Sequence, residues 1–198
     1  MDTNLFRWIN RLANRTGWAH SFFTAYANYG IVLFAVLLVV TYLDGRQRGD
    51  LRAVAGSVWA GGAALIALGV GQLIGGTIDR ARPYEAMSGV HLLIDRTTDF
   101  SFPSDHATAV GAFAVGLFFA NKRSGTIGAV LAVAMALTRV YVGAHYPSDV
   151  LVGLALGAFV AAGGVYVAVP QLYRAAAWIN RTAARALVSC EPRATDEI

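Results

Sequence analysis

Charged side chains are scarce in this sequence. Of its 198 residues, 14% are charged and 56% are hydrophobic, whereas an average soluble domain carries roughly 25% charged residues. A chain of this length could bury a sizeable core, but it could not cover that core with so little charge. The deficit excludes an ordinary soluble enzyme and indicates an integral membrane protein.

Cysteine and lysine are almost missing as well. Cys190 is the single cysteine, so a disulfide scaffold is excluded. Lys122 is the single lysine among 16 basic residues, and with 12 acidic residues the net charge is +4. No basic run with interleaved aromatic side chains occurs, so we expect no nucleic-acid partner.

Long apolar segments are what the sequence has in abundance. A transmembrane helix needs about 20 largely apolar residues, and the third segment below approaches this length only with the turn before it. The segments cover about residues 22–43, 54–78, 107–120, 125–142 and 150–169. They predict an all-α, polytopic membrane bundle of about five transmembrane helices, in a single domain over residues 1–198 with a polar tail from about residue 190.

Two flanking segments are predicted to lie at the membrane interface. In residues 4–15, Leu5, Trp8 and Leu12 share one helical face with Ile9, and arginines lie beside it. This is the pattern of an interfacial amphipathic helix. The alanine- and arginine-containing segment 171–188 is interpreted as a second interfacial helix.

The distribution of basic residues predicts the orientation. With five crossings, the N-terminus, the 79–106 loop and the 139–149 turn share one face with seven basic residues, and the other face has nine. The difference widens if two of the seven arginines belong to a site. Because cytoplasmic loops are enriched in basic residues, we expect both connections to lie outside the cytoplasm.

Three polar clusters interrupt the apolar pattern, and all three fall on this one face. They occupy residues 79–83, 102–106 and 139–149. An ionisable group at membrane depth costs several kcal/mol unless it is paired or functional. One such cluster could be structural, but three at one end of a bundle predict a functional site.

The chemistry of these clusters points to phosphate. Arg82 and Arg139 can each bind two oxygens of an anion with a planar guanidinium, which lysine cannot do. Ser104 occupies a helix N-cap position and Pro147 a first-turn position. The free N–H groups of a helix N-terminus bind anions, so two helix N-termini and two arginines predict an anion site.

Two histidines could supply the reactivity. One of His106 and His145 could attack phosphorus while the other protonates the leaving oxygen. Asp149 follows His145 by four residues and could fix the tautomer of its ring. We expect His20 at the membrane interface and His91 in a loop, without comparable partners.

These residues resemble the motifs of the type 2 phosphatidic acid phosphatase family, which is related to vanadium-dependent haloperoxidases. The family motifs are a lysine, six residues and Arg-Pro; then Pro-Ser-Gly-His; then Ser-Arg, five residues, His, three residues and Asp. The matching residues here are Arg82-Pro83, then Pro103-Ser104-Asp105-His106, then Thr138-Arg139 with His145 and Asp149. The resemblance covers about residues 55–165, which we take as the catalytic core.

The resemblance implies a role for each matching residue. His145 would be the nucleophile that becomes a phosphohistidine, His106 the general acid, and Asp149 the partner of His145. Arg82, Arg139 and Ser104 would bind the phosphoryl group, with Asp105 and Arg80 as further candidates for phosphate binding. No metal ion or other cofactor is implied.

One position departs from the family pattern. The family lysine falls on Gly75, and no lysine lies nearby. Arg80 could supply the missing charge.

The Pro-Ser-Asp-His variant, the small size and the N-terminal amphipathic segment resemble bacterial undecaprenyl-diphosphate phosphatases of the bacitracin-resistance type. This resemblance implies release of phosphate from a lipid diphosphate that enters from the bilayer, with the site facing the periplasm or cell exterior from the plasma membrane. Two alternatives stay open: a phosphatase for phosphatidylglycerophosphate, phosphatidic acid or lipid A, and a catalytically inactive membrane scaffold or transporter.

Overall fold

The structure, a computed structural model, describes residues 1–190, so the predicted polar tail lies outside the described residues. Throughout this range the regular elements are helices, which confirms the all-α prediction. In chain order they are α1 (Asp2–Arg15), η1 (Gly17–Ala19), α2 (His20–Tyr29), α3 (Ile31–Gln47), α4 (Leu51–Ile78), α5 (Pro83–Ala86), α6 (Asp105–Ala120), α7 (Lys122–Tyr141), α8 (Pro147–Ile179) and η2 (Ala183–Leu187).

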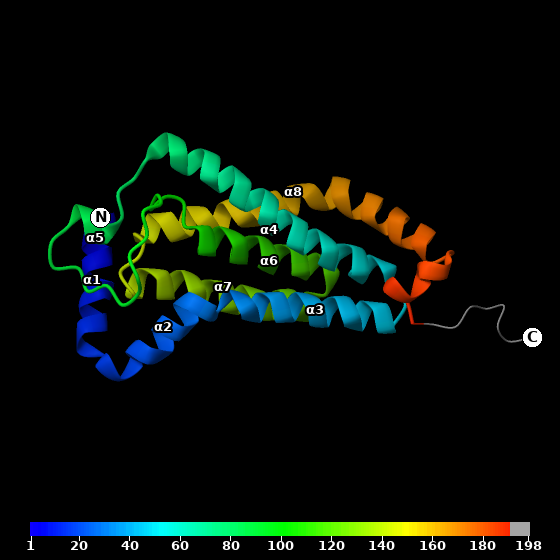
Figure 1. Cartoon of the computed structure of the whole chain (residues 1–198), viewed down its shortest axis with the longest axis horizontal. Helices are drawn as coiled ribbons and strands as arrows, with labels where there is room; N and C mark the ends of the chain where they lie inside the picture. The colour runs from blue at the N-terminus through cyan, green and yellow to red at the C-terminus, as the bar shows by residue number, and fades with distance from the viewer. Residues whose placement is uncertain (191–198) are drawn as a thin grey trace, which may run out of the picture.

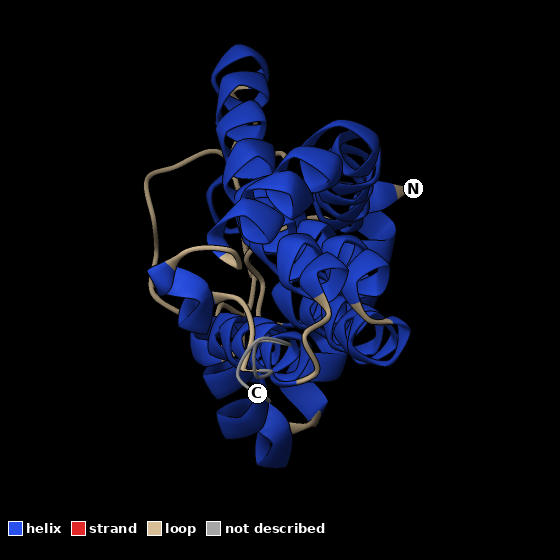
Figure 2. Cartoon of the chain, turned by 90° about the vertical axis from the view of Figure 1, so that its right-hand side faces the viewer, coloured by secondary structure: helices blue, strands red, loops and turns tan. Residues whose placement is uncertain are grey.

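Helix α6 lies at the centre of an elongated bundle (Figure 1), which Figure 2 shows end-on. It packs against α4, α7 and α8, while α4 also contacts α8 and α3. Small residues lie where these helices meet: Ala63 and Ala67 of α4, Ala112 of α6 and Ala161 of α8 are buried in one cluster. Such residues let helix backbones approach closely where lipid provides no hydrophobic driving force.

Each of the five predicted membrane segments coincides with helix. Helices α4, α7 and α8 are long and apolar enough to cross a membrane, and the shorter α6 is apolar as well. The first segment is not one straight helix, because α2 and α3 meet at Gly30 with a bend of 55°. The two halves have different partners: Thr24 of α2 donates a hydrogen bond to the carbonyl of Leu93, whereas α3 packs on α4.

The prediction of a separate interfacial helix at 171–188 is wrong. Helix α8 continues through Pro170 to Ile179, and in the part of the chain that the structure describes it is followed by the short η2. The physical reason is that the apolar pattern continues past the proline. Leu172 packs against the same buried cluster as Trp59, whose indole nitrogen donates to the carbonyl of Ala161 at 2.9 Å.

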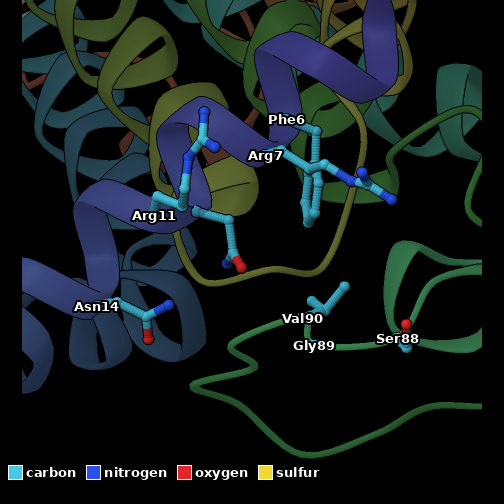
Figure 3. A pocket seen from close by; sticks show the side chains of 8 residues that line it. Phe6, Arg7, Arg11, Asn14, Ser88, Gly89 and Val90 are labelled. Atoms are coloured by element: carbon cyan, nitrogen blue, oxygen red, sulfur yellow. The ribbon is translucent and has the colours of Figure 1, made fainter.

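The N-terminal amphipathic helix is confirmed as α1, which lies across one end of the bundle (Figure 1). Phe6 and Asn10 are buried against the protein, while Leu5, Trp8 and Leu12 are exposed. Figure 3 shows α1 above the loop at residues 88–90. The apolar face of α1 is therefore free to lie against a membrane, while its other face packs on the bundle.

The same end of the bundle carries α5, the loop between α5 and α6, and the turn between α7 and α8 (Figure 1). Gly143 in that turn has a φ of +83°, and a Cβ atom on it would lie 2.7 Å from the carbonyl oxygen of His91. Glycine alone fits this conformation and this contact. The turn holds His145 in place within the functional site.

Candidate active site

His145 is the centre of the site. Its side chain is almost fully buried, and its Nδ1 lies 2.8 Å from the carbonyl oxygen of Ser101. Because a carbonyl only accepts hydrogen bonds, Nδ1 carries the proton and Nε2 carries the lone pair. An imidazole that attacks through Nε2 needs this tautomer, because its Nε2 lone pair must be free.

Two guanidinium groups face this lone pair. Nη1 of Arg82 lies 3.2 Å from Nε2 of His145, and Nη2 of Arg139 lies 3.5 Å from it. Burial, reinforced by the charges of Arg139 and Arg82, lowers the pKa of His145 well below its usual value near 6.5. The ring therefore stays neutral at physiological pH, with its lone pair beside two positive charges.

Asp99 orients Arg82. The Nε of Arg82 donates to the backbone carbonyl of Asp99 at 3.2 Å, and Nη2 donates to its carboxylate at 2.9 Å. Partial burial would raise the pKa of Asp99, but hydrogen bonding from Thr97 and the charge of Arg82 hold it below its usual value. The carboxylate is thus ionised and fixes the plane of the guanidinium.

Two buried donors at the site have no partner among the described residues. They are Nε of Arg139 and the hydroxyl of Ser104. Ser104 is the N-cap of α6, as predicted, but its hydroxyl accepts no hydrogen bond from the helix, unlike the capping side chains of Asp50 and Asn121 on α4 and α7. Buried polar groups are rarely left unpaired, so this set of donors fits an oxyanion.

His106, the second residue of α6, is half-buried and lies close enough to His145 for their charges to interact. Within residues 1–190 its ring has no hydrogen bond to another side chain or to backbone. A half-buried imidazole without a protein partner can exchange protons with a substrate oxygen, which is what a general acid requires.

Asp149 is placed differently from the expectation. Its Oδ2 is 3.9 Å from Nδ1 of His145 and instead accepts from the Ser101 hydroxyl at 2.6 Å and from the Tyr146 amide at 2.9 Å. The carboxylate turns back because it caps the first turn of its own helix. Asp149 therefore reaches His145 through Ser101 rather than directly.

The two further phosphate candidates are bound elsewhere. Arg80 forms ion pairs with Asp149 at 2.6 Å and with Asp2 at 2.7 Å, so both of its terminal nitrogens are on carboxylates. The carboxylate of Asp105 accepts a hydrogen bond from Gln72 at 2.7 Å. Among residues 1–190, neither side chain has a hydrogen bond or ion pair to His145, Arg82 or Arg139.

The expectation of two anion-binding helix N-termini also needs correction. At the start of α8, the amide of Ser148 donates to Asp2 at 3.0 Å and the amide of Tyr146 donates to Asp149. Protein carboxylates therefore occupy this N-terminus. The first turn of α6 is the helix end that faces the site with no side-chain cap.

Ser101, Asp99 and Asp2 were missed from the sequence. Ser101 acts partly through its backbone carbonyl, for which no residue type is diagnostic. Asp99 is a single acid in a loop, and Asp2 is 78 residues from its partner Arg80. For the two aspartates, the one available signal is that any charged residue is uncommon in a chain with 14% charged residues.

A family model described as the PAP2 superfamily matches residues 56–173. The chain belongs to the PAP2 superfamily. The match includes Arg82, Ser104, His106, Arg139 and His145, which are the residues that the structure gathers at one end of the bundle.

Curated PAP2 relatives have similar length. The chain is 30% identical over 151 residues to undecaprenyl-diphosphatase BcrC of Bacillus subtilis, covering 76% of each chain. It is 31% identical over 158 residues to putative undecaprenyl-diphosphatase YbjG of Escherichia coli, covering 79% of this chain and 77% of the relative. The crystal structure of Aquifex aeolicus LpxE aligns with a TM-score of 0.63 and 25% identity, over 83% of this chain and 94% of that one.

Proposed function

We propose that this PAP2 protein is a membrane phosphatase that hydrolyses undecaprenyl diphosphate to undecaprenyl phosphate and inorganic phosphate. One observation carries the proposal. The lone pair of His145 Nε2 faces the guanidinium groups of Arg82 and Arg139, beside the unpaired hydroxyl of Ser104. A nucleophile surrounded by anion-binding donors suits phosphoryl transfer.

The reaction would proceed in two displacements. In the first, Nε2 of His145 attacks the terminal phosphorus, and the bond from phosphorus to the bridging oxygen breaks as His106 gives its proton to that oxygen. Undecaprenyl phosphate leaves and a phosphohistidine forms. In the second, water attacks phosphorus while His106 accepts a proton, which releases phosphate and restores His145.

The remaining groups would bind the transferred phosphoryl group. Arg82 and Arg139 supply charged donors, and Ser104 supplies a hydroxyl. The free amides at the start of α6 add the positive end of the helix dipole. These donors would stabilise the negative charge that develops on the phosphoryl oxygens in the transition state.

The substrate is inferred from two sources. The relatives from Bacillus subtilis and Escherichia coli are named undecaprenyl-diphosphatases, the second as putative, and the Asp105 variant of the second motif resembles that group. The site would face the periplasm or cell exterior from the bacterial plasma membrane, as the arginine distribution favours, and the lipid would enter from the bilayer. We also propose a single domain, with its catalytic core at about residues 55–165.

A substrate panel tests the proposal. Phosphate release by the purified protein in detergent micelles would be compared for undecaprenyl diphosphate, phosphatidylglycerophosphate, phosphatidic acid and lipid A. We expect the highest kcat/KM with undecaprenyl diphosphate. A higher value for any other lipid would refute the substrate and leave a different lipid phosphatase in its place.

A matched pair of histidine variants tests the enzyme itself. Replacing a nucleophile lowers kcat by about a thousandfold or more, so His145→Gln should abolish turnover, whereas His20→Gln should leave it unchanged. After brief reaction with terminally ³²P-labelled substrate and alkaline quench, label should remain on the wild type and not on His145→Gln. A folded His145→Gln protein with full activity would refute His145 as the nucleophile, and a folded wild type that releases phosphate from none of the four lipids would favour the scaffold or transporter alternative.

A further inference from the structure

The first residues of α1 contact the N-terminus of α8. Asp2 Oδ1 accepts a hydrogen bond from the amide of Ser148 at 3.0 Å, and Oδ2 accepts one from its hydroxyl at 2.6 Å. Oδ2 also pairs with Nη2 of Arg80 at 2.7 Å. Both carboxylate oxygens of Asp2, on the interfacial helix α1, therefore bond to residues at the end of the bundle that holds the site.

Arg80 joins this carboxylate to a second one. Its Nη1 lies 2.6 Å from Oδ1 of Asp149 and 2.7 Å from the hydroxyl of Ser148. Its guanidinium carbon lies 4.0 Å from the centroid of the Tyr146 ring. A planar guanidinium suits this position, because it binds two carboxylates at once and packs its face on an aromatic ring.

Asp149 carries the connection to the reactive histidine. Its carboxylate is completely buried, and its second oxygen accepts from the hydroxyl of Ser101 at 2.6 Å. The carbonyl of Ser101 in turn holds Nδ1 of His145 at 2.8 Å. The loop that fixes the tautomer of His145 is thus tied to a buried carboxylate whose counter-charge is Arg80.

We propose that Asp2 and Arg80 are positioning residues for His145, so that α1 supports the active site as well as lying at the membrane interface. Without Arg80, the buried charge of Asp149 would be uncompensated, which is strongly unfavourable. Its carboxylate would then shift toward other donors, including Nδ1 of His145 at 3.9 Å. Such a shift displaces Ser101 and changes the orientation of the imidazole.

The inference rests on the proposed function, and a second anchor on α1 makes it testable. The Asn10 side chain donates to the carbonyl of His91 at 2.8 Å and accepts from its amide at 2.9 Å. Phe6 is fully buried. Because α1 is held at these positions too, Asp2→Asn should remove the contact to Arg80 without detaching the helix.

The experiment compares Asp2→Asn, Arg80→Gln and their double variant with the control Asp44→Asn. Asp44 also forms an ion pair, with Arg48 at 2.8 Å, but it lies near the end of α3, outside the site. Mutation of an outer-shell residue that orients a functional side chain typically costs roughly 10–100-fold in activity. We expect a kcat loss of this size for Arg80→Gln and a smaller one for Asp2→Asn. KM for undecaprenyl diphosphate should change by less than about twofold, because both terminal nitrogens of Arg80 are already on protein carboxylates.

Two further readouts separate positioning from general destabilisation. Asp2→Asn should add almost nothing to Arg80→Gln, because Asp2 acts through Arg80, and Asp2→Glu should recover part of the activity. In histidine ¹⁵N NMR spectra, the His145 signal is the one that is missing from His145→Gln. This signal should show the Nδ1–H tautomer in the wild type and in Asp44→Asn, and it should be perturbed in Arg80→Gln.

Each failure has its own signature. Wild-type protein that does not hydrolyse undecaprenyl diphosphate would refute the proposed function, and the NMR comparison would still decide the role of Arg80. Kinetic losses no larger than those of Asp44→Asn, additive losses in the double variant, or an unchanged His145 signal in Arg80→Gln would overturn the positioning role. A raised KM at unchanged kcat would instead assign α1 to lipid capture.

Discussion

Replacement of Arg82 by lysine tests the geometry of the site most directly. Arg82 contacts Asp99 through Nε and Nη2, and it contacts the carbonyl of Ala144 and Nε2 of His145 through Nη1, both at 3.2 Å. A lysine keeps the positive charge but presents one nitrogen in place of three. It can reach either Asp99 or the neighbourhood of His145, but not both in the same plane.

The expected loss is catalytic rather than structural. Loss of one preorganised donor to a developing oxyanion costs about 10²–10³ in kcat, or about 2.7–4 kcal/mol. The carboxylate left behind belongs to Asp99, whose side chain is 47% exposed and can be hydrated. Arg82 itself is 5% exposed, but lysine keeps its positive charge beside this hydrated carboxylate, so Arg82→Lys should fold while kcat falls at least a hundredfold.

The assay is phosphate release from undecaprenyl diphosphate, with thermal unfolding in detergent measured on the same preparations. Arg96→Lys is the matched control, because Arg96 lies in the same loop region and its guanidinium lies over the face of the Tyr84 ring, 5.5 Å from the centroid. Its kcat should match that of the wild type. Arg82→Lys with kcat within about threefold of the wild type would refute the argument that the planar guanidinium, rather than its charge, is required.

Two other predictions concern Gly75 and His145. A Cβ atom on Gly75 would lie 2.9 Å from the Phe100 ring and 3.0 Å from the carbonyl of Phe102. Gly75→Lys should therefore lower the unfolding temperature and kcat relative to the control Gly76→Lys. Higher activity of Gly75→Lys than of Gly76→Lys would contradict this. Folding lowers the pKa of His145. Below about pH 6.5 the unfolded chain therefore binds a proton at this residue that the folded protein does not bind. As a result, the free energy of unfolding falls as the pH drops below that value. The unfolding temperature should therefore decrease less between about pH 6.5 and 5 in His145→Gln than in the wild type, and equal decreases would contradict the lowered pKa.

The membrane helices could be predicted because bilayer thickness sets the length of an apolar segment. The bend at Gly30 and the extension of α8 past Pro170 could not, since both depend on partners. Thr24 bonds to a loop far along the chain, and Leu172 packs on the buried cluster that includes Trp59. Hydropathy reports that a segment is apolar, but it carries no information on what the segment packs against.

The candidate site divides in the same way. His145, Arg82 and Arg139 could be predicted because their side-chain chemistry is specific and their spacing follows the family motifs. The role of Ser101 could not, because its carbonyl acts on His145 across 44 residues of sequence. The contact of Asp149 differs from the expectation for a related reason. His145 lies just before α8 and Asp149 lies in its first turn, but the carboxylate also accepts a hydrogen bond from the amide of Tyr146 at the start of the same helix.

The glycine at the family lysine position and the support of His145 have a common structural basis. Gly75 allows the end of α4 to close against residues 100–102, and Ser101 in that segment holds Nδ1 of His145. A lysine at this position would add a cation but push away the loop that fixes the nucleophile. Arg82, Arg139 and the uncapped start of α6 still provide anion-binding donors without it, so the departure from the motif is compatible with a complete phosphoryl-transfer site.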